Sequence, residues 1–391
     1  FSKDLEQAVK AVDKSIGLQW AAIDEAGSSH RYGPEVRWRI NQGSPESYQN
    51  AAEQINRAAV DVVCLQHEFG LYGVWGDPFD DHLAPFLECL RKPLVTTLHS
   101  VLPDPSPSVR AAVRRIGGRS SKVIVMTERA RMLLLEAYGM APGKLSVVPH
   151  GVPAVAPRGR TQMKAQLALT GRSVILTFGL VDPRKGLEHM IDAMPQIRRS
   201  HPKALYLIAG KTHPDLIRYE GEVYRTRLWR QVQALGLEQH VAFVNDFLTQ
   251  SQIVDHLIAT DVYVTPYLDP KQVTSGTLAY ALGAGKAIIS TPYSHAVEVL
   301  AGGRGMLVDF RSSGQLAEAA IRILSTPALK RRLEQDAYAY GSETAWPRVG
   351  ARILGILQSA AVHSRVETPA LAGVAEPARG PHPFLPGAVS S

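Results

Sequence analysis

The pattern of apolar residues predicts a chain in which short buried strands alternate with longer amphipathic helices. The strand-like runs are continuously apolar and lack the alternation of half-buried strands, which is typical of parallel sheets covered on both faces. A first series comprises Val62–Leu65, Leu94–Leu98, Val123–Met126 and Leu145–Val148. A second comprises Val174–Phe178, Ala204–Ala209, Val241–Phe243, Val262–Thr265, Ala287–Ser290 and Met306–Val308. Two such series predict two doubly wound α/β domains.

Helical periodicity fills the intervals between the strands, as in Leu187–Arg199, Ser251–Ala259 and Gln315–Leu324. The opening FSKDLEQAVKAV also predicts an amphipathic helix, with no strand before it. A Rossmann-like domain normally opens with a strand and a glycine-rich turn, and this chain shows neither at its start.

A segment rich in Pro and Gly, PHGVPAVAPRGR, predicts the boundary between the domains at Pro149–Arg160. We therefore expect a first domain over residues 1–153 and a second over residues 154–345. A helix over 346–361 is expected to pack back on the first domain. Residues 362–391 are rich in Pro, Ala and Gly and are expected to form a flexible tail.

The composition narrows the partners and the compartment. The 391 residues carry a formal net charge of +7, which favours a phosphorylated ligand or an acidic membrane surface. Scattered basic residues do not favour nucleic acid. Cys64 and Cys89 form no disulfide framework, and Cys64 is predicted to be buried in its apolar run. No apolar run reaches the roughly 18 residues of a membrane span, and no signal peptide is visible, so a cytoplasmic protein is expected, with peripheral membrane contact as an option.

The densest chemical signal is QVTSGTLAYALGAGKAIIS, Gln272 to Ser290. Its small residues, Thr274, Ser275, Gly276 and Thr277, open a helix directly after a strand and a turn. The unpaired amides and positive dipole of a helix start suit a phosphate group. The alternative is a plain serine N-cap on a packed helix.

A second signal, GLVDPRKG, lies at the carboxyl end of the strand Val174–Phe178. Open α/β sheets bind ligands at that edge, and Arg184 and Lys185 would bring positive charge to a diphosphate. A solvated turn with two surface cations is the alternative. Gly210 ends another strand and would admit a ligand, whereas His213 beside it suits a helix start.

Histidines follow the strands of the first domain. His67 and Glu68 come after one strand and His99 after the next, while His150 lies where the last strand meets the linker. Imidazole exchanges protons near neutral pH, so these residues are candidates for a cleft between the domains. Structural histidines are the alternative.

No metal-binding pattern is evident. There is no Asp-x-Asp pair in a credible loop, and the adjacent pair Asp80–Asp81 is predicted to lie in a helix. Neither a P-loop nor a Gly-x-Ser-x-Gly nucleophile motif is present. No metal or other cofactor is therefore expected.

Several stretches in this order resemble the family 4 retaining glycosyltransferases of the GT-B fold. They are VVPHGVP, FGLVDPRKGLEHMIDAMPQIRRSHPKALYLIAG, DVYVTPY, ALGAGKAIISTPY and RGMLVDF. The resemblance covers most of residues 1–345 and implies a GT-B-like α/β fold with two Rossmann-like domains and an inter-domain cleft. It further implies that the strand and glycine-rich loop that open the family's first domain are missing from this chain.

The resemblance assigns roles residue by residue. Lys185 matches the lysine that contacts the donor diphosphate, and Ser275–Thr277 match the segment whose amides hold phosphate and sugar. His67 matches an active-site histidine, and His99 a second one. Two family glutamates align with Gln272 and Tyr280, and a family arginine aligns with Leu180. Gln272 keeps hydrogen-bonding capacity without the charge, and Tyr280 cannot chelate a diol as a carboxylate can.

The resemblance implies a hexosyltransferase that moves a sugar from a nucleotide-sugar donor to a hydroxyl of a carbohydrate or lipid-linked acceptor, with retention. His67 and Lys185 would be the catalytic pair. Another enzyme of the same fold, a sugar phosphorylase or a nucleotide-sugar epimerase, is an alternative, because the ribose-binding glutamate is replaced. A non-catalytic sugar- or nucleotide-binding subunit is a third option.

Overall fold

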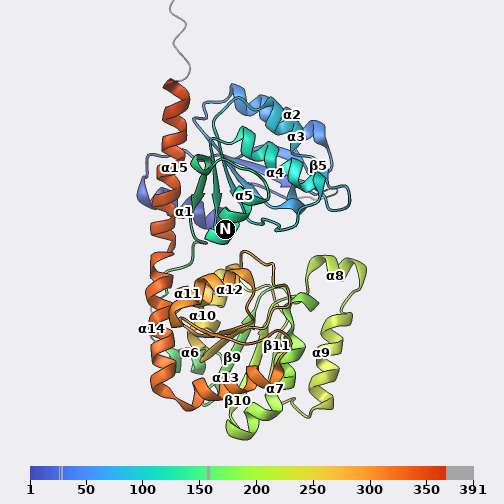
Figure 1. Cartoon of the computed structure of the whole chain (residues 1–391), viewed down its shortest axis with the longest axis vertical. Helices are drawn as coiled ribbons and strands as arrows, with labels where there is room; N and C mark the ends of the chain where they lie inside the picture. Colours follow the sequence, from blue (N-terminus) through green and yellow to red (C-terminus); the bar gives the residue numbers. More distant parts are fainter. Residues whose placement is uncertain (26, 28–29, 156–158, 367–391) are drawn as a thin grey trace, which may run out of the picture.

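The computed structural model describes residues 1–25, 27, 30–155 and 159–366, which form two α/β lobes joined along one side by two long helices (Figure 1). Each lobe has a parallel sheet with helices on both faces. The predicted fold class, with two Rossmann-like domains, is confirmed.

The N-terminal lobe is built on a four-stranded parallel sheet of order β3-β6-β7-β8. These strands are Val63–His67, Leu94–Leu98, Lys122–Val125 and Leu145–Val147, which confirms the first predicted series. The lobe's main apolar core includes helices α2 (Pro45–Arg57), α3 (Ala84–Cys89), α4 (Pro107–Arg119) and α5 (Glu128–Glu136).

A second, separate sheet in this lobe was not predicted. It pairs β1 (Trp20–Asp24) with β2 (Val36–Asn41) in parallel. Most residues of these two strands are partly or fully exposed, so they give no continuous apolar run in the sequence. The lobe's strands therefore lie in separate sheets, and β3 is an edge strand of the larger one.

Two predictions in this lobe are wrong. Asp80–Asp81 does not lie in a helix but forms β5, antiparallel to β4 (Gly73–Val74). The Asp81 carboxylate accepts hydrogen bonds from the Leu83 amide and from Arg115, so it caps the start of the following turn instead. Cys64 is exposed rather than buried, because it lies on the edge strand β3.

The C-terminal lobe contains one continuous sheet of order β11-β10-β9-β12-β13-β14, parallel throughout. The strands are β9 (Ser173–Phe178), β10 (Ala204–Ala209), β11 (Val241–Val244), β12 (Val262–Thr265), β13 (Ala287–Ser290) and β14 (Met306–Leu307), which confirms the second predicted series. The chain builds outward from β9 in one direction and then returns to β12 to build in the other. This reversal places a topological switch point between β9 and β12.

Helices cover both faces of this sheet and form two buried apolar clusters. One cluster includes α7 (Leu187–Ser200), α9 (Val223–Ala234) and α13 (Ser313–Ser325). The other includes α10 (Gln250–Ala259) and α11 (Gly276–Gly283). The three predicted helices are therefore confirmed within one or two residues at each end. Short helices α6 (Arg160–Gln166), α8 (Pro214–Tyr219) and α12 (Ser294–Val299) complete the lobe.

Two helices run along the side of the molecule from one lobe to the other (Figure 1). α14 (Pro327–Glu343) packs on the C-terminal lobe, and α15 (Trp346–Val366) packs on α1 (Ser2–Val12) of the N-terminal lobe. α15 continues past residue 361, and residues 367–391 of the predicted tail lie outside the described residues. None of the helices in the described ranges has the length and hydropathy needed to cross a bilayer.

Candidate functional site

The switch point brings loop backbones into close contact at the carboxyl ends of β9 and β10. Gly179 follows β9 and Gly210 follows β10, with φ of +126° and +141°. A Cβ on Gly210 would lie 2.1 Å from the carbonyl oxygen of Gly179, so the two loop backbones can approach this closely only because residue 210 is a glycine. Gly210 therefore serves the packing of the loop, and its predicted contact with a ligand stays a prediction.

The two cations of the loop after β9 have different interaction partners. Buried Asp182 accepts hydrogen bonds from the amide and the guanidinium of Arg184, whose side chain is 70% exposed. The ion pair raises the pKa of Arg184 and offsets its charge. The ammonium of Lys185 lies instead over the ring of Tyr267, 3.9 Å from its centroid. Lys185 thus presents a charge with no carboxylate partner among the described residues.

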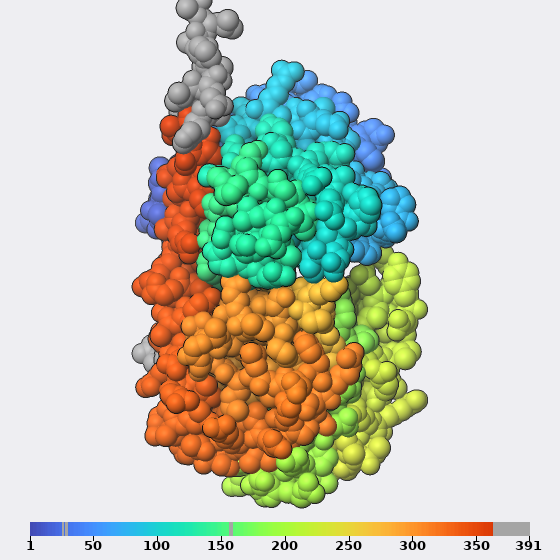
Figure 2. Space-filling view, in the orientation of Figure 1, coloured from blue at the N-terminus to red at the C-terminus, as the bar shows by residue number. Residues whose placement is uncertain are grey.

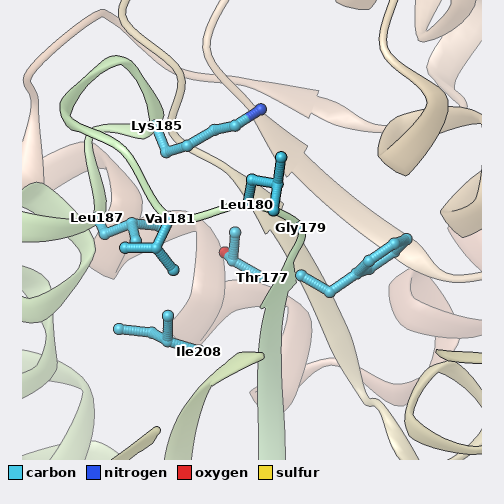
Figure 3. A pocket seen from close by; sticks show the side chains of 8 residues that line it. Thr177, Gly179, Leu180, Val181, Lys185, Leu187 and Ile208 are labelled. Carbon is cyan, nitrogen blue, oxygen red and sulfur yellow. The ribbon is translucent and has the colours of Figure 1, made fainter. Parts of the chain in front are cut away.

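Lys185 lines a small pocket at the end of β9. Figure 3 shows its side chain on the same side of this pocket as Leu180, with Thr177 and Ile208 deeper in the lobe. Leu180 stands where the resembling family has an arginine. The charge at this loop therefore comes from Lys185.

The start of α11 is held by a buried histidine. Ser275 is the N-cap residue, and its Oγ accepts a hydrogen bond from the Leu278 amide. The Ser275 amide donates to Nδ1 of His295, 2.8 Å away. Burial, with a smaller effect of His150, lowers the pKa of His295 to about 3, so its ring is neutral and Nδ1 can accept. The sequence analysis missed His295, although it follows strand β13 as the N-terminal histidines follow their strands.

A chain of hydroxyl contacts connects α11 to Lys185. Thr277 Oγ1 is 2.7 Å from the hydroxyl of Tyr267 and 3.2 Å from Oγ of Ser275. Lys185 lies over the same tyrosine ring, so Lys185 and the start of α11 share one surface. The amides of Gly276 and Thr277 have no acceptor within the described parts of the chain. The combination of a cation and free helix-start amides is suited to a phosphate.

The two residues that replace family glutamates make local contacts. Gln272 donates from Nε2 to the carbonyl oxygen of Thr274, just before the N-cap. The hydroxyl of Tyr280 accepts from Nε2 of Gln250, which also donates to Asp4 of the N-terminal lobe. Tyr280 therefore faces the contact between the lobes, and burial raises its pKa.

The predicted residues of the N-terminal lobe form a second group. His67 is buried against Tyr72, with stacked rings 5.4 Å apart, and its Nδ1 has no hydrogen-bond partner in the part of the chain that the structure describes. Burial, together with His99, lowers its pKa to about 3. His99 bonds to Oε1 of Gln66, and burial lowers its pKa to about 4. Glu68 accepts from its neighbour's amide and from Ser100, so it braces the loop after β6.

His150 connects the two groups. Its Nδ1 bonds to the carbonyl oxygen of Gly151, and its Nε2 lies 3.1 Å from where a Cβ of Gly276 would be. The ring of Phe1 contacts both His99 and His150 edge-on, at 4.7 and 5.2 Å between centroids. Burial lowers the pKa of His150 to about 4. The histidines are therefore neutral at pH 7, so they can position a ligand but do not serve as charged acids.

The lobes touch beside this site (Figure 2). Thr127 donates to the carbonyl oxygen of Val273, two residues before the N-cap of α11. The carboxylate of Glu298 accepts from the amides of Glu128 and Arg129 at the start of α5, where a negative charge is favourable. The structure thus brings Lys185, Ser275, Gly276, Thr277 and His150 into one region. Their predicted roles in binding stay predictions.

Comparison with known proteins identifies the family. The sequence profile described as "Glycosyltransferase Family 4" matches residues 31–155, and "Glycosyl transferases group 1" matches residues 159–340. A GDP-mannose-dependent alpha-(1-6)-phosphatidylinositol monomannoside mannosyltransferase of Mycolicibacterium smegmatis is 29% identical over 164 residues, 41% of this chain and 40% of that protein. A GDP-mannose-dependent monoacylated alpha-(1-6)-phosphatidylinositol monomannoside mannosyltransferase of Corynebacterium glutamicum is 25% identical over 266 residues, 65% of this chain and 66% of that protein.

The match therefore spans less than two thirds of these relatives' own length. Among solved structures, Anabaena Alr3699/HepE in complex with UDP and glucose superimposes with a TM-score of 0.67 at 19% identity. The superposition covers 80% of this chain and 81% of that one. These likenesses confirm the GT-B fold. With the two profiles covering both lobes, they show that the chain belongs to the family 4 glycosyltransferases.

Proposed function

We propose that the protein transfers a hexosyl group from a nucleoside diphosphate sugar to a hydroxyl of an acceptor. The observation that carries this proposal is the shared surface of Lys185 and the start of α11. The lysine ammonium and the amides of Gly276 and Thr277 meet there through Tyr267 and Thr277. A cation and free amides at a helix start are the groups that a diphosphate requires.

The proposed mechanism stabilises the leaving group. Negative charge grows on the departing diphosphate as the bond to the sugar breaks, and Lys185 with the two amides would meet that charge. Such preorganised donors commonly supply the largest part of catalysis. Neutral His67 would hold the sugar by a hydrogen bond. Retention of anomeric configuration belongs to the proposal, as does a reaction that needs no metal and proceeds unchanged in the presence of a chelator.

GDP-mannose is the donor that we propose first. The two curated relatives described above carry GDP-mannose-dependent in their names. Gln272 and Tyr280 offer hydrogen bonds in place of carboxylates at the donor positions. The donor sugar would then be held by neutral groups, and the charge recognition would fall on the diphosphate.

A lipid-linked acceptor is the second part of the proposal. The names of the same relatives contain phosphatidylinositol monomannoside. In the N-terminal lobe, Leu71, Val74 and Trp75 are exposed on and beside β4. Together with the net charge of +7, these apolar side chains suit peripheral contact with an acidic membrane.

The test is titration calorimetry with GDP, UDP and ADP, followed by a transfer assay with GDP-mannose and a phosphoinositol acceptor. Binding of one nucleotide that Lys185→Ala weakens at least tenfold is expected. Unchanged binding in this variant would refute the phosphate site. Binding without turnover would favour the non-catalytic subunit, and dependence on inorganic phosphate would favour a phosphorylase.

A further inference from the structure

A second pocket lies in the C-terminal lobe at the opposite edge of the sheet. Asp261 directly precedes β12 and Lys286 directly precedes β13, so the pocket is at the amino ends of these strands. The site described above lies at their carboxyl ends. The pocket has a volume of about 390 Å³ and lies between α6 and α14, which share one flank of the lobe (Figure 1). This volume lies in the range of small-molecule sites.

The surroundings of the pocket carry more positive than negative charge. α6 contributes Arg160 and Lys164, α14 contributes Lys330 and Arg331, and Lys286 comes from the loop after α11. The acidic groups are Asp261 and Glu334. The two carboxylates are already bound by Arg160, Lys164 and Lys330 at 2.5 to 3.8 Å.

Lys286 is the cation that this network leaves without a counter-ion. Its residue is 3% exposed, and it lines the pocket. Its ammonium donates a hydrogen bond to the carbonyl oxygen of Ile258 at 3.4 Å, and no carboxylate among the described residues lies within 4 Å of Nζ. Burial, and the nearby charge of Arg160, lower the pKa of Lys286 to about 7.

Two further observations point to a ligand in the same place. The Nε atom of Arg160 is buried and has no hydrogen-bond partner among the residues that the structure describes. Exposed Arg331 lines the pocket and has no ion-pair partner in the described ranges. An anion would give Lys286 and Arg331 a counter-ion and the Nε atom of Arg160 an acceptor, which removes the cost of burying Lys286 without one.

The other residues that line the pocket indicate the kind of chemical group to which the anion is attached. Val155 and Ile258 are apolar, and Tyr338 lies beside Gly285. An apolar wall with an aromatic ring suits an organic group, and the cations suit a phosphate. We propose that this pocket binds a small phosphate monoester, such as a sugar phosphate, between Lys286, Arg160 and Arg331.

The binding test uses titration calorimetry on the full chain with glucose 6-phosphate and inorganic phosphate as probes. The wild type binds glucose 6-phosphate, and Lys286→Met weakens this binding at least tenfold. Lys185→Met, at the opposite edge of the sheet, leaves it unchanged. Arg331→Ala weakens it about threefold, whereas Arg332→Ala, its exposed neighbour outside the pocket lining, has no effect.

The outcomes separate the sources of binding. Loss in Lys185→Met but not in Lys286→Met would place the phosphate at the nucleotide site and overturn the proposal. Absence of binding to the wild type at 10 mM glucose 6-phosphate would also overturn it. Inorganic phosphate that binds as tightly as the ester would overturn the assignment of an organic group. Arg331 is exposed, so we expect Arg331→Ala to fold even if Lys286→Met does not. A comparison of Arg331→Ala with Arg332→Ala then decides between binding in the pocket and non-specific attraction by surface charge.

A pH series with sulfate tests the part played by Lys286. Sulfate keeps its charge between pH 6 and 8, whereas a phosphate monoester titrates near pH 6. Lys286 is mostly protonated at pH 6 and mostly neutral at pH 8, so sulfate should bind several-fold more weakly at pH 8. Lys286→Met should remove this pH dependence. A pH dependence that persists in the variant would contradict the role of Lys286.

Discussion

Where the two lobes face each other, their polar groups differ in charge and in hydrogen bonding. In the C-terminal lobe, Lys185 and the amides of Gly276 and Thr277 have no acidic or carbonyl partner among the described residues. In the N-terminal lobe, His67 is buried and His99 is partly buried; both are neutral, and each packs against an aromatic ring. Under the proposed function, the first arrangement would receive an anion and the second an uncharged group. A diphosphate bound to a sugar presents both kinds of surface.

The sheets of the two lobes also differ, in their continuity. The C-terminal sheet is continuous over six strands, so its switch point is rigidly defined. The described strands of the N-terminal lobe lie in separate sheets, and the strand that carries His67 lies at an edge. The histidine group therefore depends more on ring packing than on the sheet to hold its position.

The largest expected effect is on the anion side. Lys185→Ala should lower kcat about 10²- to 10³-fold, because one transition-state contact to developing charge is lost. Lys211→Ala, an exposed lysine after the neighbouring strand β10, is the matched control and should leave turnover unchanged. Initial rates with GDP-mannose measure both. A loss below threefold in Lys185→Ala would remove the contrast between the lobes.

A buried histidine on the C-terminal side should behave like those of the N-terminal lobe. The folded pKa of His295 is about 3 and the unfolded value about 6.5, so the unfolded chain binds more protons below pH 6.5. Its contribution to stability is complete above pH 6.5 and falls by about 2 kcal/mol towards pH 5. Urea unfolding at pH 7 and pH 5 measures the loss. His295→Asn, which keeps an acceptor without titrating, should lose less; equal losses would contradict the buried neutral state.

The sugar-facing side is tested at His67. His67→Ala should lower turnover at least tenfold, about 1.4 kcal/mol, because the ring and its hydrogen bond are both lost. His67→Phe keeps the packing on Tyr72 but has no ring nitrogen. A low rate with native stability in His67→Phe supports the hydrogen bond. Full activity in this variant would leave His67 a packing role only.

The start of α11 should show a smaller effect on stability. Ser275→Ala removes the N-cap hydrogen bond to Leu278 and should cost about 1 kcal/mol of unfolding free energy. In a domain of this size that lowers Tm by about 2–4 °C. Ser313→Ala, inside the first turn of α13, is the control and should not change Tm. Equal shifts would show that Ser275 does not act as a cap.

The smallest effect is expected at Arg184. Its exposed guanidinium is held by Asp182, and exposed ion pairs contribute about 0–1 kcal/mol. Arg184→Ala should therefore change nucleotide affinity less than threefold by calorimetry. A loss as large as that of Lys185→Ala would show that Arg184 leaves Asp182 to bind the diphosphate, and the two cations of the loop would then act together.

The sequence predicted the C-terminal lobe better than the N-terminal lobe for a physical reason. Strands such as Val174–Phe178 are buried on both faces and leave continuous apolar runs, whereas Trp20–Asp24 and Val36–Asn41 are half exposed and leave none. The short polar strand Asp80–Asp81 has no apolar periodicity of its own and is defined by its pairing with Gly73–Val74, so the local pattern misassigned it.

The positions of the candidate site residues were predictable where they follow from local geometry. Ser275, Gly276 and Lys185 lie at strand ends and helix starts, and such positions can be recognised from neighbouring residues. His295 and Tyr267 act through contacts across the fold, at 20 and 10 residues' separation from Ser275 and Thr277. The ion pair of Arg184 with Asp182 is local, but the sequence does not show which of the two neighbouring cations, Arg184 or Lys185, turns towards that carboxylate.

The chain crosses between the lobes twice, and the two crossing segments lie side by side. Val152 donates its amide to Thr344 and accepts from Trp346, so the linker after β8 and the junction of α14 and α15 are tied together. A Cβ on Gly151 would meet the ring of Trp346 at 2.3 Å, which leaves the junction no room to slide. We therefore expect this junction to act as the hinge of any relative movement of the lobes. Lys271 and Asp104 form an ion pair between the lobes, so such a movement would change the distance between these two side chains.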